Sequence, residues 1–229
     1  MEEKMVKLNI YVKTFLVSMG IFLIGILIGM GVENYLTSDF ASRTNYVEES
    51  VREIELEMLY FQDLNETYSC NFLSEIVRRT NNNLDELSGQ LLKYSESNVL
   101  FGGTDIENLK KSYTSLLIKD WVLQERIKSI CGDKTVTILY FYDKSGCGDC
   151  VIQGSILSIL KDSFKEKVMI FPLDTKVGLT MIGILMDRFN VTSVPSLVIE
   201  EKTYSGIVVG EALKRISCDI IDENITTCS

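Results

Sequence analysis

Residues 135–150 have the sequence TVTILYFYDKSGCGDC, and this stretch decides the fold of the C-terminal part of the chain. Residues 135–142 are β-branched, aromatic or leucine, which predicts a strand buried on both faces. A polar loop follows, and Cys147-Gly-Asp-Cys150 then opens an apolar run that predicts a helix ending near Lys161. A buried strand therefore leads through a loop into a CxxC at the start of a helix.

Cys147 and Cys150 are the candidate catalytic residues. Cys147 would lie at the helix N-terminus, where unpaired backbone N–H groups and the helix dipole stabilise a thiolate. Cys150, one turn later, is placed to attack a mixed disulfide formed on Cys147. Asp149 acts in the opposite sense, because a negative charge beside the sulfurs opposes thiolate formation. The spacing thus favours thiol–disulfide exchange.

A metal site is the alternative reading of a CxxC. A structural metal site needs four ligands, and the chain contains no His and no second CxxC to complete a site for zinc or an iron–sulfur cluster. We therefore expect no metal and no other cofactor. The residues after the CxxC instead continue an α/β alternation, with strands predicted at 168–171, 196–200 and 203–209 and a helix at 178–189.

The CGDC after a buried strand, the following strand and helix, Val194-Pro195 and a final β-hairpin together resemble the thioredoxin-like superfamily. The resemblance implies an α/β domain over 132–217 with a central mixed sheet flanked by helices. It implies that Cys147 is the exposed nucleophile and Cys150 the buried resolving thiol. It also implies that Pro195 is a cis-proline against the CxxC, and that the Val194 backbone offers a strand-like edge to a substrate chain.

Two positions depart from the thioredoxin pattern. Gly146 precedes the first cysteine where thioredoxins usually have Trp, and Phe141 occupies the strand position of the buried acid that shuttles a proton to the resolving thiol. These departures leave a second hypothesis open. The domain could be a non-catalytic or slowly cycling adaptor subunit of a membrane complex that binds client polypeptides.

The N-terminal part predicts a membrane anchor. Residues 14–32, TFLVSMGIFLIGILIGMGV, include 19 residues without a charge, which as a helix would extend about 28 Å against about 30 Å of hydrocarbon. A cleaved signal peptide is the rival, but its apolar region is usually shorter. We expect an uncleaved transmembrane helix that serves as a signal anchor.

The flanking charges predict the orientation of this anchor. Lys4, Lys7 and Lys13 precede the span, whereas Arg43 is the one basic residue close behind it. The positive-inside rule then places residues 1–13 in the cytoplasm and the rest outside. The expected localisation is that of a single-pass membrane protein with an extracytoplasmic thioredoxin-like domain, and a reductase facing the cytosol is the alternative.

A helical stalk or hairpin is predicted over 33–131. Residues 45–131 contain no proline, and apolar residues recur at spacings of three and four, as in packed helices or a coiled coil. Three helices are implied, the last two joined by a turn near 101–103. Because Cys70 and Cys131 lie about equally far from that turn, antiparallel packing predicts a Cys70–Cys131 disulfide. Two unrelated buried thiols are the alternative.

The C-terminal tail, 218–229, contains Cys218 and Cys228. A local disulfide between them is expected, and free thiols or a pair that relays electrons to Cys147 and Cys150 remain open as alternatives.

The composition of the whole chain excludes several functions. The absence of His removes Ser-His and Cys-His nucleophile pairs, and an excess of 32 acidic over 23 basic residues argues against nucleic acid as a partner.

The sequence as a whole predicts a membrane-anchored, extracytoplasmic thiol–disulfide oxidoreductase or isomerase. The reaction would pass through a mixed disulfide between Cys147 and a client cysteine, which Cys150 resolves. The expected partners are cysteine-containing client proteins, a redox partner that recycles the dithiol, and the membrane through the single N-terminal helix.

Overall fold

The computed structural model describes residues 13–28, 66–96, 103–221 and 228. Residues 13–28 form a helix in one compact unit, and the other described residues belong to a second unit. The first of the three predicted stalk helices and most of the turn near 101–103 lie outside the described residues.

The transmembrane anchor predicted at 14–32 is wrong. Across 13–28, 66–96, 103–221 and 228, no helix combines the length and the apolar character needed to cross a membrane. The predicted single-pass localisation, with a cytoplasmic N-terminus and an extracytoplasmic domain, is corrected with it.

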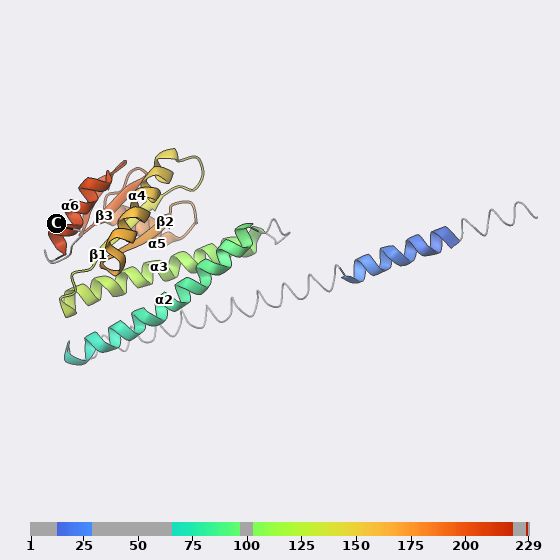
Figure 1. The fold of residues 1–229 in the computed structure, drawn as a ribbon, viewed down its shortest axis with the longest axis horizontal. Coiled ribbons are helices and arrows are strands. Elements are labelled where there is room, and N and C mark those ends of the chain that lie inside the picture. The colour runs from blue at the N-terminus through green and yellow to red at the C-terminus, as the bar shows by residue number, and fades with distance from the viewer. Residues whose placement is uncertain (1–12, 29–65, 97–102, 222–227, 229) are drawn as a thin grey trace, which may run out of the picture. The chain divides into compact units, whose positions relative to one another are not determined.

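Two long helices, α2 (Glu66–Glu96) and α3 (Gly103–Cys131), lie side by side as an antiparallel hairpin (Figure 1). The seam between them is apolar because buried side chains recur at spacings of three, seven and eight. They are Leu73, Ile76, Leu84 and Leu87 of α2 and Leu109, Leu116 and Leu123 of α3. A Cys70–Cys131 disulfide closes the end away from the turn, with 5.8 Å between the Cα atoms, as the spacing of the two cysteines predicted.

The described residues after the hairpin contain a four-stranded mixed sheet in the order β2-β1-β3-β4. Its strands are β1 (Val136–Tyr142), β2 (Val168–Asp174), β3 (Ser196–Ile199) and β4 (Lys202–Ser205). β1 pairs parallel with β2 and antiparallel with β3, and β3 pairs antiparallel with β4. The parallel pair needs a crossover, which α4 (Gly148–Phe164) and the 3-10 turn η1 (Lys165–Lys167) supply.

Helices cover both faces of the sheet (Figure 1). α4 and α6 (Gly210–Ile220) cover one face, where Val136, Ile138 and Tyr140 of β1 pack with Leu157 of α4 and Leu213 of α6. The strand predicted at 203–209 is shorter in the structure, because β4 ends at Ser205. The predicted tail, 218–229, is also shorter, because α6 continues to Ile220 and includes Cys218.

The other face of the sheet is covered by α3 and α5 (Thr180–Arg188). Thr137 of β1 donates a hydrogen bond to Glu125 of α3. The ring of Trp121 in α3 meets the ring of Phe189 edge to face, with 6.0 Å between the centroids. α3 is thus at once the second arm of the hairpin and a covering layer of the sheet.

Candidate functional site

The CxxC lies where the central strand passes into α4. β1 ends at Tyr142, and in the loop that follows the Ser145 N–H donates to a carboxylate oxygen of Asp143 at 2.7 Å. Gly146 then has a φ of 86°, in the left-handed region that residues with a Cβ disfavour. This backbone geometry explains why glycine, and not Trp, precedes the first cysteine.

Cys147 and Cys150 are joined by a disulfide across the first turn of α4. Cys147 is the N-cap residue, and its sulfur accepts a hydrogen bond from the Cys150 backbone N–H at 3.1 Å. Cys147 is half-buried, whereas Cys150 is only 4% exposed. An incoming thiol can therefore reach the first sulfur more readily than the second.

Val194 and Pro195 come from the segment before β3. The bond between them is cis, Val194 is half-buried and Pro195 is buried. The β1–β3 register pairs Phe141 with Ser196, so Pro195 lies at the end of the sheet from which the CxxC loop departs. The substrate-binding role of this pair stays a prediction.

Two residues of the site escaped the sequence reasoning. Tyr140 of β1 donates its hydroxyl to the backbone carbonyl of Cys150 at 2.5 Å. Gln153, fully buried one turn after Cys150, accepts a hydrogen bond from the Val208 N–H at 2.7 Å through its side-chain oxygen. A polar residue on the apolar face of the CxxC helix was the available signal for Gln153, while Tyr140 looked like an ordinary strand residue.

Exposed apolar side chains lie on the CxxC helix and on a loop that contacts this helix. Val151 and Ile152 follow Cys150 directly in α4, and Ile207 and Val209 belong to the loop after β4. The hydrogen bond from Val208 to Gln153 holds that loop against α4. The surroundings of the sulfurs are thus suited to contact with an apolar stretch of a polypeptide.

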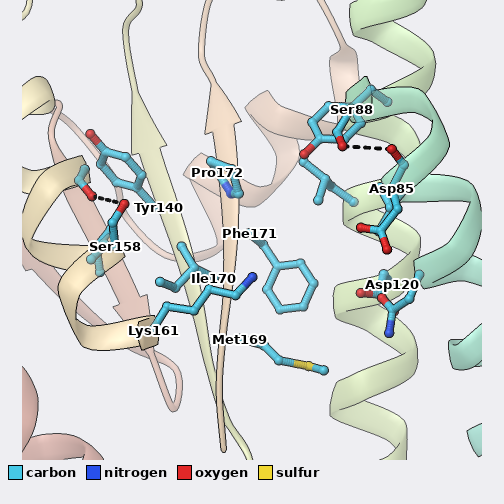
Figure 2. A pocket seen from close by; sticks show the side chains of 16 residues that line it. Asp85, Ser88, Asp120, Tyr140, Ser158, Lys161, Met169, Ile170, Phe171 and Pro172 are labelled. Atoms are coloured by element: carbon cyan, nitrogen blue, oxygen red, sulfur yellow. Dashed lines mark hydrogen bonds between the residues drawn. The ribbon is translucent and has the colours of Figure 1, made fainter. Parts of the chain in front are cut away.

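A cavity of about 500 Å³ lies on the β2 side of α4, between α4, the free edge of β2 and the helical hairpin (Figure 2). Asp120 of α3 borders the cavity and is 3% exposed. Burial raises the pKa of its carboxyl to about 7, and a hydrogen bond with Gln124 opposes that shift. Tyr140, which contacts the Cys150 carbonyl, forms part of the opposite wall. Phe141, at the position of the thioredoxin acid, is fully buried on β1.

The third disulfide joins Cys218, in the last turn of α6, to Cys228. Both cysteines pack against the core that lies between α6 and the sheet. This is the local pairing that the sequence predicted, and it fastens the last part of the chain to α6.

Several solved structures are similar to this chain. A chloroplastic thioredoxin z is 18% identical, with 42% of this chain and 87% of that chain covered and a TM-score of 0.34. Thioredoxin-2 of the malaria parasite, described as a component of the protein secretion machinery, is 23% identical, covering 36% and 80%, with a TM-score of 0.31. The germline-specific thioredoxin Deadhead of Drosophila melanogaster is 19% identical, covering 45% and 94%, with a TM-score of 0.33. No protein-family model and no curated protein matches the chain.

The architecture itself carries the fold assignment. A mixed sheet has helices on both faces, and the CxxC stands between the central strand β1 and the crossover helix α4, as the resemblance implied. The predicted thioredoxin-like α/β fold is therefore confirmed for the C-terminal domain.

Proposed function

We propose that this thioredoxin-like chain is a thiol–disulfide oxidoreductase that acts through Cys147 and Cys150. The observation that carries the proposal is the disulfide across the first turn of α4, with its first sulfur half-buried and its second enclosed. A helix N-terminus stabilises the thiolate that exchange requires, because its backbone N–H groups have no partners within the helix. The Cys150 N–H already points at the Cys147 sulfur.

The exchange proceeds in two balanced steps. In the reduced protein the Cys147 thiolate attacks a client disulfide, a Cys147–client bond forms, and the other client sulfur leaves as a thiolate. The Cys150 thiolate then attacks the Cys147 sulfur, so that the Cys147–Cys150 bond forms as the client sulfur departs. Two electrons pass to the client. A client dithiol that attacks the oxidised protein at Cys147 runs the same steps in reverse.

The proposed clients are cysteine-containing polypeptides, and a separate redox partner restores the dithiol after each cycle. Two features support a polypeptide client. The apolar side chains of Val151 and Ile152 on α4, and of Ile207 and Val209 on the loop that contacts α4, are exposed. The Val194 backbone, next to Pro195 at the same end of the sheet, would offer hydrogen bonds to an extended client segment.

A trapping experiment tests the proposal. The variant Cys150→Ser, with its Cys70–Cys131 and Cys218–Cys228 disulfides left intact, is mixed with a peptide that contains one disulfide, and covalent adducts are measured by mass spectrometry. We expect a stable adduct on Cys147, because the residue that resolves the mixed disulfide is missing. The matched control Cys147→Ser/Cys150→Ser should form none.

The adaptor hypothesis predicts a different outcome. Its support is Phe141, which leaves no carboxyl at the position of the proton-shuttling acid. If Cys150→Ser forms no adduct while the double variant binds the peptide as tightly as the unchanged protein, the oxidoreductase proposal fails and the adaptor remains.

A further inference from the structure

The buried face of α4 carries one polar side chain in a row of otherwise apolar or sulfur-containing ones. That row, all within a helix that the structure describes completely, consists of Cys150, Gln153, Leu157, Leu160 and Phe164. Residues three apart on a helix are neighbours on one face, so Gln153 is the next buried side chain along α4 from the resolving sulfur. Its side chain is 0% exposed, which keeps water away from its amide.

The amide of Gln153 is satisfied on one side only. Its Oε1 accepts the hydrogen bond from Val208, and this bond fixes which way the amide group points. Its Nε2 is buried and has no hydrogen-bond partner among the residues that the structure describes. Because an unpaired buried donor costs free energy, an amide held in this way is expected to meet an acceptor in some state of the protein.

The acceptor that changes between states is Cys150. In the oxidised protein its sulfur is part of a disulfide and is a weak acceptor, whereas the resolving step needs it as a thiolate, which accepts strongly. The other polar groups near it are already used or unsuited. The Tyr140 hydroxyl donates to the Cys150 carbonyl, and the Asp149 carboxylate is exposed and carries the wrong charge.

We propose that Gln153 is a further catalytic residue, whose Nε2–H donates to the Cys150 thiolate when the mixed disulfide is resolved; this inference rests on the proposed function. Gln153 transfers no proton. It stabilises the negative charge on Cys150 until the electron pair of that sulfur forms the Cys147–Cys150 bond and the client sulfur leaves with the pair of the broken bond. In a site without a carboxyl at Phe141, an amide held by the Val208 loop thus supplies the polar contact to the resolving sulfur.

The test measures the pH dependence of mixed-disulfide resolution. A Cys147–peptide adduct is formed and the release of peptide by Cys150 is followed by stopped flow from pH 5 to 9, for the unchanged protein and for Gln153→Met. Removing one charge-assisted hydrogen bond is expected to move the midpoint of the profile up by about one pH unit, and to slow resolution about tenfold below that midpoint. Leu157→Met, a change on the same buried face, is the matched control and should leave the profile unchanged.

A purely structural role for Gln153 has a different signature. It would slow the first attack by Cys147 and the resolution by Cys150 together, and it would not move the pH midpoint. That result overturns the inference while the proposed function stands. A lack of exchange by the unchanged protein would instead overturn the proposed function itself, so the two failures are distinguishable.

A second measurement needs no variant and therefore does not depend on its folding. The side-chain amide resonances of Gln153 are followed by NMR on reduction and then across the same pH range. We expect them to shift with the midpoint of the resolution rate, because the acceptor gains its charge there. Asn190, an exposed side-chain amide outside the CxxC helix, is the internal control and should not follow this midpoint. Equal behaviour of the two amides would also overturn the inference.

Discussion

The disulfide at the start of α4 and the disulfide at the closed end of the hairpin share one bond type and differ in what they connect. Cys147 and Cys150 are three residues apart within one helical turn. Cys70 and Cys131 are 61 residues apart and fasten two long helices to each other. Since the entropy removed from the unfolded chain grows with the length of the closed loop, the first bond constrains little and can open reversibly, while the second acts as a clamp.

The largest expected effect tests this difference directly. Cys70→Ser/Cys131→Ser should lower the free energy of unfolding by about 4 kcal/mol in the chain-entropy account of a loop of this length. Cys147→Ser/Cys150→Ser should lower it by less than about 2 kcal/mol, because the loop that this bond closes is a single turn of α4. Urea unfolding without reductant measures both. Equal losses would show that loop length does not separate the two bonds.

The loss of unfolding free energy on removal of the Cys218–Cys228 bond is expected to lie between these two values. Its loop spans 10 residues, which corresponds to about 2–3 kcal/mol in the same account. The variant Cys218→Ser/Cys228→Ser should therefore unfold at an intermediate urea concentration and exchange thiols at the rate of the unchanged protein. A tenfold loss of exchange would favour the alternative in which this pair relays electrons to Cys147 and Cys150.

The hairpin side of the molecule also contains a buried carboxyl, that of Asp120. Burial raises the pKa of Asp120 to about 7, so between about pH 4 and pH 7 the folded protein holds a proton that the unfolded chain has lost. Stability should fall as the pH rises through this window. Asp120→Asn removes the dependence and should raise the free energy of unfolding at pH 8 by about 1–3 kcal/mol.

Unfolding in urea at pH 4 and at pH 8 measures this effect. The variant and the unchanged protein should differ at pH 8 and nearly coincide at pH 4. A change in thiol exchange in Asp120→Asn would mean that the carboxyl serves the sulfurs across the cavity, and would weaken the separation of the two regions.

The smallest effect concerns Tyr140, which links the CxxC turn to the sheet. Tyr140→Phe removes the hydroxyl that donates to the Cys150 carbonyl and should cost about 1 kcal/mol. The loss should be the same in the oxidised and the reduced protein, because the carbonyl accepts in both. A loss confined to one redox state, measured by thermal unfolding, would indicate that this contact also responds to the sulfurs.

Local sequence patterns predicted β1, the CxxC helix and the hairpin, because the residues that specify each of these elements are close together in the sequence. The boundaries that failed depend on tertiary context. The predicted second strand, 168–171, ends before Pro172, but Pro172 belongs to β2. A proline is tolerated there because β2 is an edge strand and the missing N–H faces away from the ladder. Apolar β-branched residues at 207–209 suggested a longer last strand, but Gly206 takes a φ of 80° and the chain turns into α6.

The site followed the same division. The positions of Cys147 and Cys150 follow from the motif, whereas the contacts around them come from distant segments. The amide of Gln153 is oriented by a hydrogen bond from Val208, which is 55 residues later in the chain.

The position of α3 limits how this protein can be shortened. One side of α3 packs against α2, and Trp121, Glu125 and Lys128 meet the sheet or the loops at its end. A fragment that begins at residue 132 would leave apolar sheet surface open to water and would be prone to aggregate. Fusion partners and affinity tags at the N-terminal side are therefore best joined ahead of Glu66, so that both arms accompany the redox domain.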